Sequence, residues 1–276
     1  MDELLTGTDE VDRPFTLDVN GKTVSAHLSA TTRSDTVFLF AHGAGGGLDA
    51  PVMRHTTHRL REAAPVLRWT GNANLASRLK QLYALIEHAS SNQIMLIGRS
   101  MGARAAARAY VEYQGHAKLD ERLILQSYPL NGPKADDTSR LDALLALPST
   151  ARVLFAIGTK DSMCPRADLD AARAKMAAQS WVMWIEGADH GLGKREELVI
   201  EAGRRMGIWS KGELPEAREA TLRLDEGEVR WSGWSDAVTV DVPEPAPASE
   251  TTAKRKAAVA DAEEGETGER RSKRRR

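Results

Sequence analysis

The order of apolar and amphipathic segments predicts an α/β fold, in which a mostly parallel central sheet carries helices on both faces. Continuous apolar runs such as Thr36–Ala41 and Gln93–Ile97 have the length and composition of buried strands. Amphipathic segments such as Asn74–His88, with apolar residues at helical spacing, alternate with these runs. Because strands that alternate with helices form βαβ units, we expect the sheet to be largely parallel.

The elements can be predicted in chain order from the same patterns. An opening hairpin of Phe15–Asn20 and Thr23–Ser29, joined at Asn20-Gly21, should lie antiparallel at one edge of the sheet. A late hairpin of Val229–Trp231 and Ala237–Val240 is predicted around Ser232-Gly233. The other predicted strands are Thr36–Ala41, Pro65–Trp69, Gln93–Ile97, Arg122–Gln126, Arg152–Ile157 and Trp181–Ile185, and the predicted helices are Asn74–His88, Met101–Tyr113, Ser139–Leu147, Ala167–Ala178 and Lys194–Arg205.

The charge distribution divides the chain into an acidic body and a basic tail. The 276 residues hold 38 Lys and Arg against 39 Asp and Glu, a formal net charge of −1. Residues 254–276 hold nine basic and five acidic side chains, so they carry +4 and the rest carries −5. An acidic body argues against a protein that binds nucleic acid over its whole surface. No apolar run approaches the ~20 residues that span a bilayer, so we expect no membrane contact.

Composition predicts three regions: a flexible N-terminus over residues 1–12, an α/β domain over 13–242 and a disordered tail over 243–276. From Pro243 the chain lacks aromatic residues and is rich in Pro, Ala, Ser, Thr, Glu and Lys. Such a segment buries too little surface to offset its ordering entropy. Residues 1–12 are acidic and lack the pattern of a secretory signal. The single cysteine, Cys164, excludes an intramolecular disulfide and is expected to be a small buried residue.

Two basic clusters in the tail have the spacing of a bipartite nuclear localisation signal. Lys254–Lys256 and Arg270–Arg276 are separated by thirteen residues. The alternative is a tail that only solubilises the chain or contacts RNA through charge, without sequence specificity. We therefore expect a nuclear import receptor as a partner, no sequence-specific nucleic acid, and residence in the nucleus and cytoplasm.

The pentapeptide Gly98-Arg99-Ser100-Met101-Gly102 matches G-x-S-x-G and lies between an apolar strand and a helix. This is the setting of a nucleophile elbow, in which a serine occupies a sharp strand-to-helix turn. The two glycines remove contacts that a Cβ would make, and the turn presents the hydroxyl at a helix N-terminus. We predict Ser100 as a nucleophile and the Met101 N–H as an oxyanion donor, with a purely structural turn as the alternative.

A serine nucleophile needs a base, and the base needs an orienting acid. Asp161 follows the predicted strand Arg152–Ile157, and His190 follows the predicted strand Trp181–Ile185. Both residues therefore lie beyond the C-terminal ends of strands, where open α/β sheets place their sites. The order Ser, Asp, His is also the chain order of enzymes built on this elbow. We predict Ser100, Asp161 and His190 as the catalytic residues.

Each of these residues has an alternative interpretation. Asp161 could cap the helix that follows it, and a lone histidine such as His190 is often a surface or core residue. Asp168 and Asp189 compete as the acid, but the first lies within the following helix and the second adjoins the histidine. Arg99, beside the serine, could contact an acidic substrate group or form a structural ion pair under the loop, and we favour the ion pair.

A glycine-rich loop, HGAGGG at residues 42–47, follows the first predicted central strand. It matches the HG-x loop that supplies the second oxyanion donor in such sites. We predict the Ala44 N–H as this donor and His42 as a residue that orients the loop, with Gly43 and Gly45 in support. A phosphate-binding loop is the alternative, but the sequence lacks both the G-x-x-x-x-G-K-[ST] and the G-x-G-x-x-G patterns.

Five stretches together carry a resemblance that covers about residues 36–207: Phe40–Met53, Ile97–Ala106, Gln126–Lys134, Gly158–Pro165 and Gly187–Leu192. In these stretches the chain resembles α/β-hydrolases, and more narrowly a dienelactone-hydrolase-like branch. That branch includes small bacterial hydrolases, a testis-expressed hydrolase-like protein and the hydrolase-like domain of a subunit of the non-specific-lethal histone acetyltransferase complex. The branch usually reads SYPLH where this chain has Asn131, and GG where it has Gly102-Ala103. Neither departure removes a predicted catalytic or oxyanion residue, and the resemblance implies Asn131 as a supporting residue.

The resemblance implies an α/β-hydrolase fold and a serine hydrolase of carboxylic ester or thioester bonds. About a dozen residues separate the strand Arg122–Gln126 from the next predicted helix, which predicts a minimal lid and a small-molecule acyl substrate. The reaction requires an acyl-enzyme intermediate and neither a metal nor an organic cofactor. The alternative function is a catalytically silent hydrolase-like scaffold in a nuclear, chromatin-associated complex, and a peptidase is a third possibility.

Overall fold

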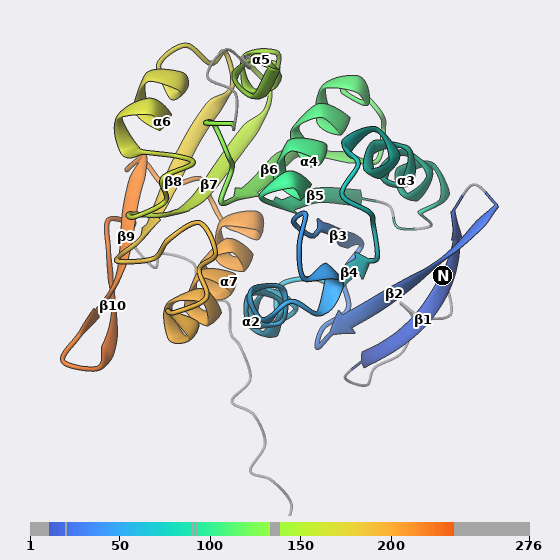
Figure 1. Ribbon diagram of the computed structural model, residues 1–276, viewed down its shortest axis with the longest axis horizontal. Helices are drawn as coiled ribbons and strands as arrows, with labels where there is room; N and C mark the ends of the chain where they lie inside the picture. Colours follow the sequence, from blue (N-terminus) through green and yellow to red (C-terminus); the bar gives the residue numbers. More distant parts are fainter. Residues whose placement is uncertain (1–10, 20, 90, 92, 133–138, 235–276) are drawn as a thin grey trace, which may run out of the picture. The chain divides into compact units, whose positions relative to one another are not determined.

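The computed structural model describes residues 11–19, 21–89, 91, 93–132 and 139–234 (Figure 1). The chain divides into two units, Met1–Val238 and Thr239–Arg276, and only the first contains described residues. The predicted tail, with its basic clusters Lys254–Lys256 and Arg270–Arg276, lies outside the described residues. The account that follows concerns the first unit.

Ten described strands form one mixed sheet in the order β1-β2-β4-β3-β5-β6-β7-β8-β9-β10. The strands from β4 to β9 run parallel to one another, whereas β1, β2 and β10 pair antiparallel at the two edges. The predicted α/β class and the antiparallel opening hairpin are therefore confirmed. The strands are β1 (Val11–Val19), β2 (Lys22–Ala30), β3 (Thr36–Ala41), β4 (Val66–Trp69), β5 (Gln93–Arg99), β6 (Leu119–Gln126), β7 (Arg152–Gly158), β8 (Gln179–Ile185), β9 (Glu219–Asp225) and β10 (Glu228–Ser232).

Helices cover both faces of the sheet (Figure 1). The helices α2 and α7 pack against each other on one face, while α3, α4, α5 and α6 lie in succession on the other. None of the helices in the described part of the chain is long and apolar enough to cross a bilayer. The helices are η1 (Gly47–Asp49), α2 (Pro51–Leu60), α3 (Leu75–His88), α4 (Met101–Glu112), α5 (Ser139–Leu145), α6 (Arg166–Arg173) and α7 (Glu196–Lys211).

The apolar core is divided by the sheet into two layers. In β3, Val37 and Leu39 point into the layer under α3 and α4, whereas Phe38 and Phe40 point into the layer under α2 and α7. This alternation follows from the two-residue period of a strand, and burial on both faces explains why the run is continuously apolar. The strands are thereby fixed from both sides, which gives the loops at their carboxyl ends a rigid base.

Helix α2 and strand β9 are absent from the predicted elements. The segment Pro51–Leu60 contains two threonines and two histidines, which weaken its helical signal, although a proline at the first helical position is a known start signal. Its packing against α7 depends on Gly203, because a Cβ there would lie 2.1 Å from the Thr56 carbonyl oxygen. The α2–α7 contact therefore requires close backbone approach that the apolar pattern alone does not reveal.

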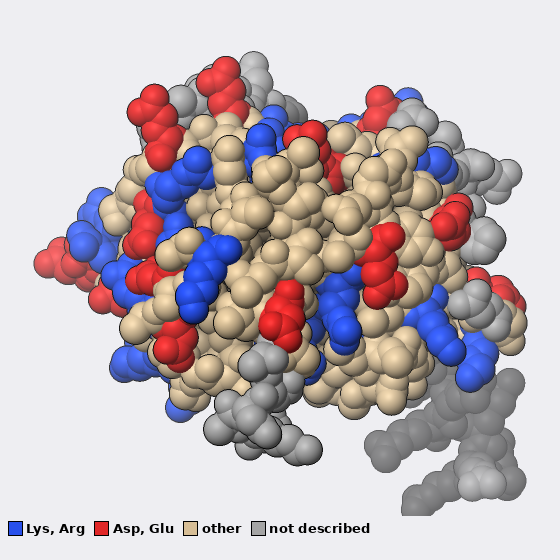
Figure 2. Space-filling model, turned by 90° about the horizontal axis from the view of Figure 1, so that it is seen from above, with Lys and Arg blue, Asp and Glu red and all other residues tan. Residues whose placement is uncertain are grey.

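The second hairpin differs from the predicted one. Val229–Trp231 lies in a strand as predicted, but β10 pairs with β9 across the turn Glu226-Gly227, both of which have positive φ. The predicted partner, Ala237–Val240, lies outside the described residues. In the first hairpin, Gly21 has φ +72°, as the turn requires, and Asn20 lies outside the described residues. On the face shown in Figure 2, basic side chains are interspersed with acidic ones.

Candidate active site

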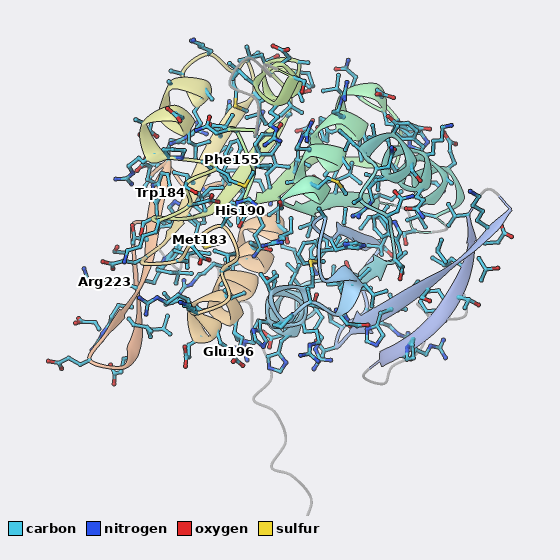
Figure 3. All side chains as sticks on the ribbon, in the orientation of Figure 1. Phe155, Met183, Trp184, His190, Glu196 and Arg223 are labelled. Carbon is cyan, nitrogen blue, oxygen red and sulfur yellow. The ribbon has the colours of Figure 1, made fainter. Side chains whose placement is uncertain are left out.

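Loops that follow four parallel strands bring the predicted residues to one edge of the sheet. Because these strands run parallel, their carboxyl ends meet at that edge. Figure 3 labels His190 in the loop between β8 and α7. His42 follows β3, Ser100 follows β5, Asp161 follows β7 and His190 follows β8.

Ser100 occupies a strained turn between β5 and α4. Its backbone has φ 53° and ψ −117°, a conformation that residues with a Cβ rarely adopt. The close approach of the flanking chain explains the two glycines of the motif. A Cβ on Gly98 would lie 2.3 Å from the Gly102 carbonyl oxygen, and one on Gly102 would lie 2.0 Å from that of Ala41. The geometry of the predicted elbow is therefore present, with the serine held at the start of α4.

Ser100, His190 and Asp161 form one continuous chain of hydrogen bonds. The Ser100 Oγ lies 2.9 Å from His190 Nε2, and His190 Nδ1 lies 2.9 Å from Asp161 Oδ2. The Asp161 carboxylate is fully buried and an ionised carboxylate can only accept, so Nδ1 carries the proton and Nε2 accepts from the serine. The His190 side chain is 22% exposed, so this part of the hydrogen-bonded chain is partly accessible to solvent.

The competing assignments for the acid are resolved by hydrogen bonding. Asp161 does not cap α6, because that helix begins at Arg166. The Asp161 Oδ1 instead accepts from the Met163 N–H at 2.9 Å. Asp168 accepts from the Asn131 side chain at 2.8 Å. Asp189 accepts from two backbone N–H groups of its own turn, those of Gly191 and Leu192. Only Asp161, of these three aspartates, contacts the histidine.

His42 holds the glycine-rich loop through both ring nitrogens. Its Nδ1 donates to the Gly43 carbonyl at 2.6 Å, and its Nε2 accepts from the Gly71 N–H at 2.9 Å. One nitrogen donates and the other accepts, so the ring is the neutral Nδ1–H tautomer. Burial and then the nearby Arg78 charge lower the pKa of His42 from 6.5 to about 4. The predicted orienting role of His42 matches these contacts.

Arg78, a residue that the sequence motifs do not include, lies beneath the same loop. Its guanidinium is fully buried and donates to the carbonyls of His42, Gly43, Gly71 and Asn72. No carboxylate pairs with it within the described part of the chain, and burial lowers its pKa to about 10. The one sequence signal was its position on α3, on the apolar face and four residues before the core residue Leu82.

Arg99 contacts backbone carbonyls, so the favoured prediction of an ion pair is wrong. Its Nη2 donates to the His190 carbonyl at 2.9 Å and to the Gly191 carbonyl at 3.4 Å. Burial lowers the pKa of Arg99, and the charges of Asp161 and Asp189 offset part of this effect. The carbonyls of the loop after β8 turn toward the guanidinium and replace a carboxylate as its partners. Arg99 thus joins the turn at Ser100 to the loop that carries His190.

The remaining predicted residues lie around these loops. Met101 is the first residue of α4, where backbone N–H groups have no intrahelical acceptor, and Ala44 is exposed in the loop after β3. Gly43 is required by space, because a Cβ there would lie 2.7 Å from Arg99 Nη1, whereas Gly45 has open space around it. The Asn131 side-chain amide donates to Asp168 on α6, and the Asn131 backbone N–H donates to the Met163 carbonyl in the Asp161 loop at 2.8 Å.

Cys164 is fully buried below the Asp161 turn, as predicted. Burial raises the pKa of its thiol to about 12, and the Asp161 charge adds to the shift. A thiol in this state is not a nucleophile at neutral pH, so Cys164 does not compete with Ser100 for that predicted role. Among the described residues, no group of three His, Cys, Asp or Glu side chains gathers in an arrangement suited to a metal ion.

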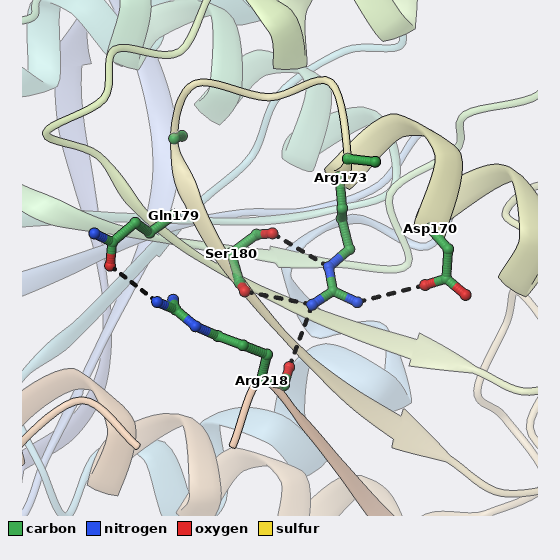
Figure 4. Close-up of a pocket in the computed structure, with 7 residues that line it drawn as sticks. Asp170, Arg173, Gln179, Ser180 and Arg218 are labelled. Atoms are coloured by element: carbon green, nitrogen blue, oxygen red, sulfur yellow. Dashed lines mark hydrogen bonds and ion pairs between the residues drawn. The ribbon is translucent and has the colours of Figure 1, made fainter. Parts of the chain in front are cut away.

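A cavity of about 400 Å³ lies at the other edge of the sheet, where β8 begins (Figure 4). Arg173 and Arg218 line it together with Asp170, Gln179 and Ser180. Arg173 is saturated, because it bonds Asp170, Ser180, the Arg218 carbonyl and Glu219. This cavity lies at the amino ends of the strands and is separate from the hydrogen-bonded chain at their carboxyl ends.

The fold is that of the α/β hydrolases. A family model described as an alpha/beta hydrolase domain matches residues 71–205, a range that includes Ser100, Asp161 and His190. The match and the ten-stranded sheet support the α/β-hydrolase superfamily. The finer resemblance to the histone acetyltransferase subunit stays a prediction.

Solved structures with the same fold have low sequence identity to this chain. A dienelactone hydrolase from Anabaena variabilis has a TM-score of 0.60 and 15% identity, over 73% of this chain and 97% of that one. An α/β serine hydrolase homologue from Coxiella burnetii has a TM-score of 0.59 and 16% identity, over 71% and 97%. An α/β serine hydrolase without a lid from Xanthomonas campestris has a TM-score of 0.57 and 16% identity, over 75% and 96%. At such identities the likeness shows the fold alone.

Proposed function

We propose that this protein is a serine hydrolase of carboxylic ester or thioester bonds, with Ser100 as the nucleophile. The observation that carries the proposal is the continuous hydrogen-bonded chain from Ser100 through His190 to the buried Asp161. The strained backbone of Ser100 supports it, because strain of this kind is retained where it serves a site. A serine that only formed a turn would need neither the base nor the acid.

In the proposed reaction, His190 Nε2 takes the Ser100 proton as Oγ attacks the acyl carbon. The N–H groups of Ala44 and Met101 hold the oxyanion, and the N-terminus of α4 adds its dipole. His190 then protonates the leaving group. Water activated by the same ring hydrolyses the acyl enzyme, which releases the carboxylic acid and restores the Ser100 hydroxyl. Asp161 fixes the imidazole tautomer and stabilises the imidazolium.

A small acyl substrate is part of the proposal. The loop after β6 is short, and among the described residues no helix lies between Gln126 and Ser139. The Xanthomonas campestris neighbour, which is described as lacking a lid, has the same fold. An open site of this kind suits small acyl groups, or flexible chains whose reactive end reaches Ser100.

Labelling with a fluorophosphonate probe tests the proposal, because the probe reacts only with a serine that a base activates. We expect the wild-type protein to be labelled and Ser100→Ala to remain unlabelled. Ser149→Ala is the matched control, because Ser149 is an exposed serine away from this edge, and it should label like the wild type. A folded wild-type protein that resists the probe would contradict the enzyme and favour the scaffold alternative.

We propose separately that the tail is a nuclear localisation signal. The sequence of Lys254–Lys256 and Arg270–Arg276 supports it through composition and spacing. Removal of residues 253–276 from a fluorescent fusion should disperse the protein from the nucleus. An unchanged distribution would refute the localisation signal without affecting the proposed reaction.

A further inference from the structure

We infer that Arg78 is a positioning residue for the proposed oxyanion hole, acting through the backbone carbonyls that set the direction of the Ala44 N–H. The role rests on the proposed function of Ser100 and assigns a task to a residue outside the motifs. Arg78 belongs to α3, whereas the predicted donor belongs to the loop after β3. The connection between them consists of hydrogen bonds to the main chain.

The orientation of the Ala44 N–H follows from the peptide bond that joins Gly43 to Ala44. The Gly43 carbonyl accepts from His42 Nδ1 at 2.6 Å and from Arg78 Nη2 at 3.4 Å. No described peptide bond is cis, and in a planar trans peptide the C=O and the next N–H point in opposite directions. The Ala44 N–H is therefore directed away from the His42 and Arg78 groups that bond the Gly43 carbonyl.

The same loop lies beside the proposed nucleophile. A Cβ built on Gly43 would lie 3.4 Å from the Ser100 Cβ, so the peptide that carries the Ala44 N–H adjoins the reacting hydroxyl. An oxyanion donor contributes most when its direction is fixed before the reaction begins. Holding the carbonyl of this peptide is thus a direct way to fix the donor.

An arginine suits this task better than a lysine. Its planar guanidinium reaches carbonyls of two loops, His42 and Gly43 after β3, and Gly71 and Asn72 after β4. The Gly71 N–H also donates to His42 Nε2, so the same two loops are joined twice. A lysine ammonium is a single point with three donors and would leave part of this set unpaired. Replacement of the guanidinium by an ammonium should therefore loosen the loop after β3 even though the charge is kept.

Gly71 provides an independent way to displace the guanidinium. A Cβ on Gly71 would lie 2.4 Å from Arg78 Nε. The φ angle of Gly71 is not positive, so an alanine fits its backbone conformation. Gly71→Ala should therefore move the Arg78 side chain without removing it and without straining its own backbone. This variant serves where substitution of Arg78 itself prevents folding.

Two measurements on Arg78→Lys, Arg78→Met and Gly71→Ala test the inference, with Lys80→Met as the control on the exposed side of α3. The first measurement is amide hydrogen exchange, and we expect faster exchange over residues 42–47 in the three variants but not in the control. The second is ester hydrolysis with inhibition by an aryl boronic acid, whose anionic adduct occupies the oxyanion hole. We expect kcat to fall about 10²-fold and the inhibition constant to rise to a similar degree, with KM nearly unchanged.

The outcomes separate this inference from the proposed function. Folded Arg78→Lys or Gly71→Ala with wild-type exchange over residues 42–47 would overturn the positioning role. Faster exchange without a change in kcat or in boronic acid inhibition would overturn it as well, because the loop would then be loosened without consequence. If the wild-type protein fails to react with a fluorophosphonate, the proposed function fails, and hydrogen exchange still decides whether Arg78 holds the loop.

Discussion

The two halves of the candidate site hold their buried charge in different ways. On the side of β7 and β8, the buried Asp161 carboxylate faces the His190 ring. On the side of β3 and β4, the buried Arg78 guanidinium faces only backbone carbonyls among the described residues. A buried charge must be compensated, and here one half uses a titratable partner and the other uses fixed dipoles.

The difference matches the tasks proposed for the two halves. A proton must move through His190, so its partner is a side chain that responds to the charge on the ring. The oxyanion loop must keep one geometry throughout, so main-chain dipoles held by an arginine serve it well. The base side is therefore sensitive to chemistry at single atoms, whereas the loop side is sensitive to space and to hydrogen-bond geometry.

The largest expected effect comes from breaking the base side at Asp161. Asp161→Asn should lower kcat about 10⁴-fold with little change in fold, because the amide favours the wrong imidazole tautomer. Asp168→Asn is the matched control, since Asp168 bonds Asn131 and does not contact His190. Steady-state hydrolysis of an activated ester measures both variants. Equal losses in the two variants would contradict the assignment of Asp161.

The next effect concerns space at the elbow and compares two glycines. Gly102→Ala should destabilise the fold by more than about 3 kcal/mol, because its Cβ would lie 2.0 Å from the Ala41 carbonyl oxygen. Gly45→Ala should change the free energy of unfolding by less than about 0.5 kcal/mol, since nothing lies within 4 Å of that Cβ. Urea unfolding of both variants is the measurement. A Gly102→Ala protein as stable as the wild type would show that the turn and β3 are less tightly packed than described.

Most of the base side was predictable, because the proposed chemistry belongs to the side chains themselves and so to residue types that the sequence shows. Ser100, Asp161 and His190 occur in a fixed order after apolar runs, and strand direction places them at one edge. Most of the predicted strands and helices are present, since both core layers leave a periodic pattern. In contrast, α6 ends earlier than predicted, at Arg173, and α7 continues to Lys211. These ends depend on packing and capping, which periodicity does not encode.

The loop side was predictable only in part. The motif indicated His42 and Ala44, but Arg78 lies 36 positions after His42 and belongs to no motif. A charged residue on an apolar helix face departs from the amphipathic pattern. Its partners are backbone carbonyls, which every residue type has, so no side chain in the sequence indicates them. Likewise, the favoured ion pair of Arg99 was wrong because its partners are carbonyls. Interactions with the main chain leave no residue type for the sequence to reveal.

The smallest expected effect sharpens the loop side through the pH dependence of stability. The pKa of His42 is about 4 in the folded protein and 6.5 in the reference state, so the unfolded chain binds a proton first as the pH falls. The stability contributed by neutral His42 is complete above pH 6.5 and is lost as the pH falls toward 4. The loss amounts to at most about 3 kcal/mol.

The comparison of two histidine variants isolates this contribution from that of the carboxylates, which titrate in the same range. His42→Asn lacks the titrating ring, while its amide can still donate to the Gly43 carbonyl. Its free energy of unfolding should therefore fall less steeply than that of the wild type between pH 6.5 and 4. His58→Asn, which removes an exposed histidine of α2, should keep the wild-type slope. If His42→Asn also keeps it, then His42 accepts a proton in the folded protein, and the loop is held less rigidly than its two hydrogen bonds indicate.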